Sequence, residues 1–205
     1  QRVFLVLKVY PHNAGTKDAV LALEHSLKRL ATDHLDLYLL HWRGGVPLAE
    51  TVRAFDGLKR AGKILNWGVS NFDTDDMMEL DALPGCAVNQ VLYNPEHRGI
   101  EFDLLPWHEK RNIPIMAYSP IGQGGRLLRN AALGRVAARH GVTAAQVAIA
   151  WGLRQTGVIS IPKAATTMHV RENAAAGAIA LTAGDLADID AAFPPPRRKQ
   201  ALAML

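Results

Sequence analysis

In the stretch Leu37-Tyr38-Leu39-Leu40-His41-Trp42, a short unbroken apolar run, Leu37 to Leu40, ends at the ionisable side chain of His41. Such a run predicts a strand that is buried on both faces of a parallel sheet. The same arrangement recurs along the chain, where further short apolar runs end at Lys8, Ser70-Asn71, Asn89-Gln90, Tyr118-Ser119 and Lys163. Segments with helical spacing lie between these runs, so strands and helices are expected to alternate.

A barrel built from such units gathers the carboxyl ends of its strands into one rim, and that rim carries the chemistry. We therefore predict an α/β fold of the (β/α)8 TIM-barrel type, with about six of the eight units in this chain. An open sheet is the alternative. It normally carries a Gly-rich turn after its first strand, and Lys8-Val9-Tyr10-Pro11-His12 contains no glycine.

The helices are expected from apolar residues three and four positions apart, as at Val20, Leu23, Leu27 and Leu30. Helix starts are predicted at Asp73, and at the capping pairs Thr143 with Gln146 and Thr182 with Asp185. Because no low-complexity linker interrupts the pattern, residues 1–205 are predicted to form a single domain that is incomplete at its N-terminus.

Composition excludes several classes of protein. The chain has 205 residues, 49% hydrophobic and 20% charged, with a formal charge of +4, which is ordinary for a globular domain. Its basic residues are scattered, so nucleic acid is not an expected partner. No apolar stretch reaches the ~20 residues needed to span a bilayer, and Cys86 is the single cysteine. We expect a cytoplasmic protein. The eight histidines form no ligand-spaced cluster, so no metal is expected.

Several motifs in order resemble those of the aldo-keto reductases, in particular the bacterial diketogulonate-reductase-like branch. They are residues 37–42, Gly68-Val69-Ser70-Asn71-Phe72, Asn89-Gln90-Val91, residues 117–122 (AYSPIG) and Ile161-Pro162-Lys163. The resemblance runs from about Val3 to the last helix. It implies a (β/α)8 barrel that binds NADPH in an extended form and reduces aldehydes or ketones to alcohols. Hydride passes to the carbonyl carbon, and a Tyr hydroxyl protonates the oxygen.

The resemblance assigns catalytic roles to two residues. Lys8 matches the catalytic lysine, and His41 matches the histidine that orients the carbonyl. Tyr10 and Trp42 are expected to line the substrate pocket. Taken alone, Lys8 could be a lysine at a strand end whose stem covers apolar surface, and His41 could be a hydrogen-bonded core residue.

The cofactor residues are likewise implied by the resemblance. Ser70, Asn71 and Gln90 match residues that bind the nicotinamide carboxamide, and Tyr118 matches the aromatic that stacks on the ring. Capping of a strand end is the alternative for each of the polar ones. The remaining cofactor residues follow the last two strands, where barrels commonly hold phosphate: Ser119, Ile121, Gly122, Arg126, Ile161, Lys163, Thr166, His169, Glu172 and Asn173.

Three features depart from the family pattern. The Tyr proton donor and its Asp partner belong to a strand that lies before Gln1, so the chain alone is expected to be poorly active or inactive. His169 stands where many members place an Arg beside the 2′-phosphate, which leaves NADH as an alternative cofactor. The loop at residues 42–47 is short, so the pocket is expected to be open.

We therefore predict NADPH-dependent reduction of small aldehydes, ketones or dicarbonyls. A non-catalytic NADP(H)-binding sensor or interaction module is the alternative, because the cofactor residues are present without the donor. A complete barrel is expected to be a monomer. A truly truncated one would expose two sheet edges and associate.

Overall fold

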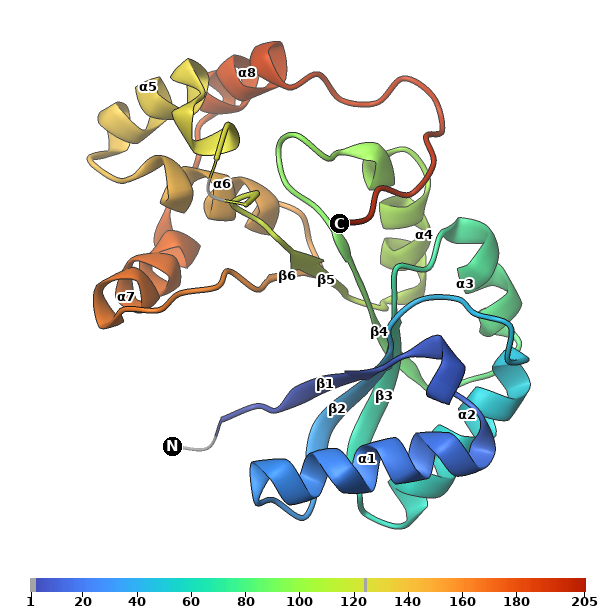
Figure 1. The fold of residues 1–205 in the computed structure, drawn as a ribbon. Helices are drawn as coiled ribbons and strands as arrows, with labels where there is room; N and C mark the ends of the chain where they lie inside the picture. The colour runs from blue at the N-terminus through green and yellow to red at the C-terminus, as the bar shows by residue number, and fades with distance from the viewer. Residues whose placement is uncertain (1–2, 124) are drawn as a thin grey trace. The chain divides into compact units, whose positions relative to one another are not determined.

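The computed structural model describes residues 3–123 and 125–205, and in this part of the chain strands alternate with helices (Figure 1). The order of the strands in the sheet follows the chain. They are β1 (Val6–Val9), β2 (Leu35–Leu40), β3 (Ile64–Ser70), β4 (Cys86–Leu92), β5 (Ile115–Tyr118) and β6 (Val158–Ser160). The chain divides into two compact units, Gln1–Gln90 and Val91–Leu205. The prediction of a single domain stays a prediction.

The first unit pairs its strands in parallel. Lys8 of β1 lies opposite Leu39 of β2, Leu40 lies opposite Val69 of β3, and Ser70 lies opposite Gln90 of β4. β2 is buried along its whole length, as its unbroken apolar sequence predicts. The helices of this unit are α1 (Thr16–Leu30), α2 (Leu48–Arg60) and α3 (Thr74–Asp81), with a 3-10 turn η1 (Pro11–Asn13) after β1.

The structure shifts the first strand relative to the sequence expectation. The sequence placed Lys8 after the apolar run, but β1 spans Val6–Val9 and includes it. Pairing with β2 continues to Val9, which lies opposite Leu40. Since neighbouring residues of a strand point to opposite faces, Val9 is buried while Lys8 is exposed.

The second unit holds the remaining elements. They are η2 (Gly99–Glu101), α4 (Leu104–Arg111), η3 (Leu127–Arg129), α5 (Ala131–His140), α6 (Ala144–Leu153), α7 (Thr167–Ala175), η4 (Ala176–Ala178) and α8 (Ala183–Ala192), together with β5 and β6. α6 is the most apolar helix, and Trp151 at its end is fully buried.

The predicted helix starts are confirmed. Asp73, Thr143 and Thr182 each cap a helix, and each forms a reciprocal capping box with the residue three positions on. These side chains satisfy backbone N–H groups that have no partner inside the helix.

An ionic network around the buried Arg98 organises the second unit. Arg98 donates to Glu101 at 2.8 Å and to Asp190 of α8 at 2.6 Å. Arg154, after α6, donates to the other oxygen of Glu101 at 2.9 Å, and the Tyr93 hydroxyl donates to that same oxygen at 2.6 Å. The segment that follows β4 is therefore tied to both α6 and α8.

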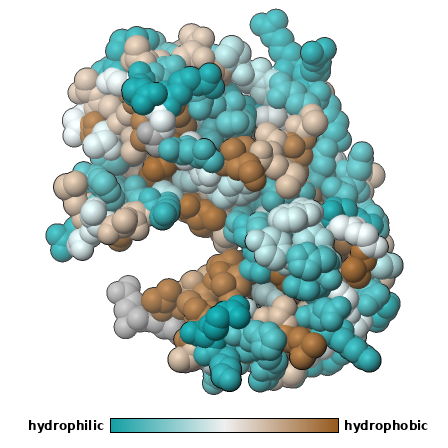
Figure 2. Space-filling view, viewed as in Figure 1, coloured by the Kyte–Doolittle hydropathy of each residue, from teal (hydrophilic) through white to brown (hydrophobic). Residues whose placement is uncertain are grey.

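The face shown in Figure 2 is mostly polar, with apolar groups between the polar ones. Val3 and Phe4, which precede β1, are the most exposed large apolar residues of the first unit, at 72% and 61%. None of the described helices combines the length and the apolar character that a membrane span requires.

Gly68 and Gly134 form a matched pair for a test of packing. A Cβ on Gly68 would overlap the carbonyl oxygen of Val88 and lie 2.9 Å from its Cγ1, whereas one on Gly134 meets nothing within 4 Å. We expect Gly68→Ala to lower the free energy of unfolding by about 1–3 kcal/mol, and Gly134→Ala in α5 to raise it by about 0.5–1 kcal/mol. Urea unfolding of both variants measures the change in the free energy of unfolding. Equal changes in the two variants would contradict the close packing described at Gly68.

His108 predicts a pH dependence of stability. It is buried in α4 with its Nδ1 at 3.0 Å from the Ile113 carbonyl oxygen, and burial lowers its pKa from 6.5 to about 4. Below pH 6.5 the unfolded chain takes up a proton that the folded chain refuses until about pH 4. The free energy of unfolding should therefore decrease by up to about 1.4 kcal/mol per pH unit as the pH is lowered from 6.5 to about 4.

Urea unfolding between pH 4 and 7 measures the slope of the free energy of unfolding against pH. The variant His108→Asn retains a side-chain N–H for Ile113 but does not titrate, so its slope should be flatter. His25→Asn, at an exposed position of α1, should keep the wild-type slope. An unchanged slope in His108→Asn would show that His108 is not its source.

Candidate active site

Five of the predicted residues in the first unit lie at the carboxyl ends of neighbouring strands. Lys8 is in β1, His41 directly follows β2, Ser70 ends β3, Asn71 follows it and Gln90 is in β4. Because these strands are parallel and in register, their carboxyl ends meet at the same edge of the sheet.

Gln90 is the centre of this group. Its side-chain Oε1 accepts a hydrogen bond from the Lys8 amine at 2.9 Å. Its backbone carbonyl accepts from the Ser70 hydroxyl at 2.8 Å and from the Asn71 backbone N–H at 2.9 Å. One residue of β4 therefore positions groups from β1 and from the end of β3.

Asn71 extends the group to His41. Its side-chain amide donates to the His41 carbonyl at 3.1 Å and to the Ser70 hydroxyl at 3.3 Å. Its backbone has a φ of 57°, a left-handed conformation in which Asn is enriched among non-glycine residues. These bonds connect all five residues.

The positive charge of Lys8 affects the pKa of His41. Although Lys8 as a whole residue is exposed, the partial burial of its amine lowers its pKa. The pKa of His41 is lowered by burial and also by the positive charge of Lys8. The imidazole is therefore neutral at pH 7 and can offer one N–H to a carbonyl oxygen, while the ammonium supplies positive charge where an oxyanion would develop.

Aromatic rings surround His41. The ring of Tyr10 stacks on it with centroids 5.2 Å apart. Trp42, the next residue after β2, has its ring centroid 4.6 Å from that of His41. Tyr10 and Trp42 contact each other edge to face at 5.5 Å. Sequence reasoning missed His12, which stacks on Tyr10 at 5.5 Å. Its place two residues after Tyr10, in a turn that begins with Pro11, was the available signal.

The second unit carries the other predicted cofactor residues. Tyr118 ends β5, and burial raises its pKa. Ser119 follows with a φ of 48°, and its carbonyl accepts from the Gly122 N–H at 2.9 Å. Gly122 has a φ of 64°, so this turn uses a left-handed residue at each end. Ile121 lies within it, half-buried.

The glycine-rich stretch continues to Arg126. Gly124 lies outside the described residues. The Arg126 Nε donates to Glu96 Oε1 at 2.9 Å, while its side chain stays 86% exposed. A pocket of about 250 Å³ is lined by both residues and by Asn94, Gly122 and others. Sequence reasoning missed Asn94 and Glu96, although Asn94-Pro95 is a turn dipeptide after a strand end.

The predicted cofactor residues that follow β6 lie in a loop and on α7. Ile161 donates its N–H to the Ala117 carbonyl at 3.1 Å, and Lys163 is exposed in the loop. Thr166 caps α7, its hydroxyl accepting from the His169 N–H at 3.2 Å. Exposed amides at a helix start favour anions. His169, Glu172 and Asn173 lie on α7, and the Glu172 carbonyl accepts from the Gln146 side chain at 3.2 Å.

The structure thus joins Lys8, His41, Ser70, Asn71 and Gln90 by hydrogen bonds in the first unit. In the second unit it places the phosphate-side residues on the loops after β5 and β6 and on α7. In the part of the chain that the structure describes, no three His, Cys, Asp or Glu residues are grouped so that they could hold a metal ion.

Comparison with known proteins agrees with this arrangement. The sequence model of the Aldo/keto reductase family matches residues 1–193. The chain belongs to the aldo/keto reductase family. It is 52% identical over 212 residues to methylglyoxal reductase YeaE of Escherichia coli, covering 100% of this chain and 75% of that protein. Glyoxal reductase of Bacillus subtilis is 38% identical over 193 residues, covering 93% of this chain and 68% of that protein.

Solved aldo/keto reductases share the fold. A Klebsiella pneumoniae enzyme in complex with NADP and acetate superposes with a TM-score of 0.96 at 50% identity, covering 99% of this chain and 74% of that one. The predicted α/β fold of the (β/α)8 type is therefore confirmed. The predicted class, an NADP-dependent aldo-keto reductase that reduces carbonyls, is confirmed by the family and these relatives. The roles of individual site residues stay predictions.

The proximity of Lys8 and His41 can be tested by titration. Because the positive charge of Lys8 lowers the His41 pKa, Lys8→Met should raise that pKa. NMR titration of the His41 ring measures it. Lys63→Met removes an equal charge from a lysine paired with Glu24 at 3.1 Å and should leave the His41 pKa unchanged. A His41 pKa that does not move in Lys8→Met would refute the proposed electrostatic coupling.

Proposed function

We propose that this aldo/keto reductase reduces small, uncharged dicarbonyls of the 2-oxoaldehyde type with NADPH. The single observation that carries the proposal is the chain of hydrogen bonds from Lys8 through Gln90, Ser70 and Asn71 to His41. It links the two residues that would act on a carbonyl to three that would hold a nicotinamide. The similarity to methylglyoxal and glyoxal reductases supports the substrate class.

In this proposal, NADPH supplies the hydride, and the chain's own residues prepare the carbonyl. The neutral His41 ring donates one hydrogen bond to the carbonyl oxygen and so orients it. The Lys8 amine stabilises the negative charge that grows on that oxygen and lowers the pKa of the Tyr hydroxyl that protonates it. That Tyr is the proton donor that the family resemblance implies. Ser70, Asn71 and Gln90 hold the carboxamide, which fixes the face of the ring that is presented.

The second unit would bind the rest of the cofactor. Tyr118 would stack on the nicotinamide, and the turn at Ser119–Gly122 with Arg126 would contact the pyrophosphate. Ile161 would pack against the cofactor, and Lys163 with Thr166 at the start of α7 would receive the 2′-phosphate. Glu172 and Asn173 would contact the adenine. His169 offers one hydrogen bond where an Arg would offer two, so we expect a modest preference for NADPH over NADH.

The substrate side favours small neutral molecules. Tyr10 and Trp42 form an aromatic wall beside His41. The cation nearest to this wall along the chain, Arg43, donates to Glu79 at 3.1 Å and to the Val46 carbonyl at 3.1 Å. Since these bonds hold it, Arg43 is not offered to a substrate carboxylate. A compact dicarbonyl without a negative charge fits this wall better than an oxoacid.

Kinetics of the intact protein test the proposal. NADPH oxidation is followed with methylglyoxal, glyoxal, a simple aldehyde and a 2-oxoacid. We expect the highest kcat/KM with the two dicarbonyls. Lys8→Met and His41→Ala should each lower kcat at least about 100-fold, because charge stabilisation of this kind typically accounts for such factors.

Lys63→Met, which lies outside the site, serves as the control and should keep wild-type kinetics. Failure to oxidise NADPH with any carbonyl would refute the catalytic proposal. NADPH binding without turnover would instead favour a cofactor-binding module. Preference for the oxoacid would refute only the substrate class.

A further inference from the structure

Asn94 is a buried polar residue to which the family resemblance gives no role. It lies two residues after β4 and is 1% exposed. Buried side-chain amides are generally retained where their hydrogen bonds fix neighbouring segments. Asn94 makes such bonds in two directions, one with its amide nitrogen and the other with its amide oxygen.

The amide nitrogen holds the turn after β5. Asn94 Nδ2 donates to the Ser119 carbonyl oxygen at 2.9 Å. Ser119 has a φ of 48°, which non-glycine residues adopt rarely. The same carbonyl accepts the Gly122 N–H that closes the turn. Asn94 therefore stabilises the strained residue at which the cofactor loop begins.

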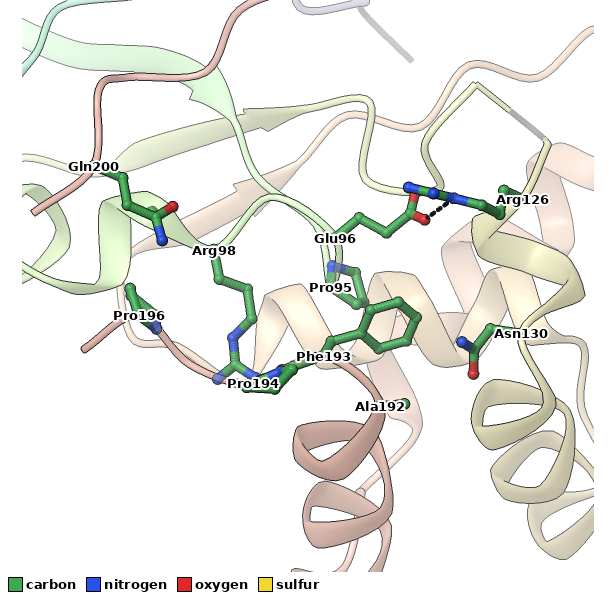
Figure 3. A pocket seen from close by; sticks show the side chains of 11 residues that line it. Pro95, Glu96, Arg98, Arg126, Asn130, Ala192, Phe193, Pro194, Pro196 and Gln200 are labelled. Carbon is green, nitrogen blue, oxygen red and sulfur yellow. Dashed lines mark hydrogen bonds and ion pairs between the residues drawn. The ribbon is translucent and has the colours of Figure 1, made fainter. Parts of the chain in front are cut away.

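The amide oxygen holds the other end of that loop indirectly. Asn94 Oδ1 accepts the backbone N–H of Glu96 at 2.9 Å and that of His97 at 3.1 Å. The Glu96 carboxylate so placed accepts from Arg126 Nε at 2.9 Å, as the dashed line in Figure 3 shows. The guanidinium of Arg126 is thereby oriented, although its side chain is largely exposed.

This segment is anchored from behind. Next to the Glu96–Arg126 pair is a pocket of about 450 Å³, lined among others by Pro95, Arg98 and Phe193 (Figure 3). Arg98 donates to the Phe193 carbonyl and to Asp190, so the segment that carries Asn94 is fixed to α8. It can act as a rigid support because its own position does not depend on the loop it holds.

We propose that Asn94 is a positioning residue for the cofactor. It holds Ser119 directly and Arg126 through Glu96, so that both ends of the loop are set before NADPH binds. The inference rests on the proposed function, in which this loop contacts the pyrophosphate. A pre-set loop loses less conformational entropy on binding, and this raises affinity.

The sharpest test is Asn94→Asp. It keeps the acceptor for Glu96 and His97, removes the donor to Ser119, and places a carboxylate oxygen against a carbonyl. We expect the Kd for NADPH, measured by fluorescence titration, to rise about 10-fold. Asn130→Asp makes the same chemical change at the cap of α5, where the side chain only accepts a bond from Ala132, and should leave the Kd unchanged.

Two further readouts separate positioning from general destabilisation. The Kd for NADH should rise by the same factor as that for NADPH, because the pyrophosphate is common to both cofactors, while the KM for the carbonyl stays constant. Adding Ser119→Gly, which adopts a positive φ without strain, should restore most of the affinity. If Asn94→Asp does not fold, Asn94→Ser replaces it, since its hydroxyl can still cap the turn but is too short to reach Ser119.

The outcomes distinguish the two proposals. A wild-type protein that fails to bind NADPH refutes the proposed function. If the wild type binds NADPH and folded Asn94→Asp binds it equally well, only the role of Asn94 is refuted. A loss of affinity that Ser119→Gly does not relieve also refutes it, because the defect would then lie elsewhere than in the turn.

Discussion

Hydrogen bonds to the backbone carbonyl and the side-chain amide of Gln90 hold together the candidate site residues of the first unit. Together these two groups accept bonds from Lys8, Ser70 and Asn71, which belong to strands far apart in the sequence. This is possible because parallel strands in register end at one edge. If β4 were displaced along β3 by one residue, its side chains would exchange faces, and Gln90 would lose the Lys8 amine. Register therefore controls the position of the Lys8 amine and so the geometry offered to a carbonyl.

A second constraint appears where strands end. Asn71 after β3 and Ser119 after β5 are both left-handed non-glycine residues, and each forms a hydrogen bond with β4 or with the segment that directly follows it. Asn71 donates its N–H to Gln90, and the Ser119 carbonyl accepts from Asn94. The backbone turns sharply at both places, so the residues that follow leave the sheet in a defined direction. Strain at these two positions is thus tied to the residues that would contact a cofactor.

Much of the fold could be predicted because its signals are local. The six apolar runs each became a strand, one helix start was found from a capping residue, and two were found from capping pairs. Lys8 was expected to follow the first strand but lies within it, because the end of β1 is set by pairing with β2 and not by its own composition. His12, Asn94 and Glu96 escaped prediction for a related reason. Each gains its importance from a ring or a hydrogen-bond partner that the sequence does not mark.

The amino-acid sequence was sufficient for the order of strands and helices, the family and the set of polar residues that end the strands, since these follow from periodicity and from motifs read in order. Tertiary structure alone decided that the Lys8 amine meets Gln90, that His41 is kept neutral beside a cation, and that Glu96 holds Arg126. The physical reason is that hydrogen bonds and charge interactions act over a few ångströms. Residues 82 positions apart, as Lys8 and Gln90 are, come within that range only after the chain has folded.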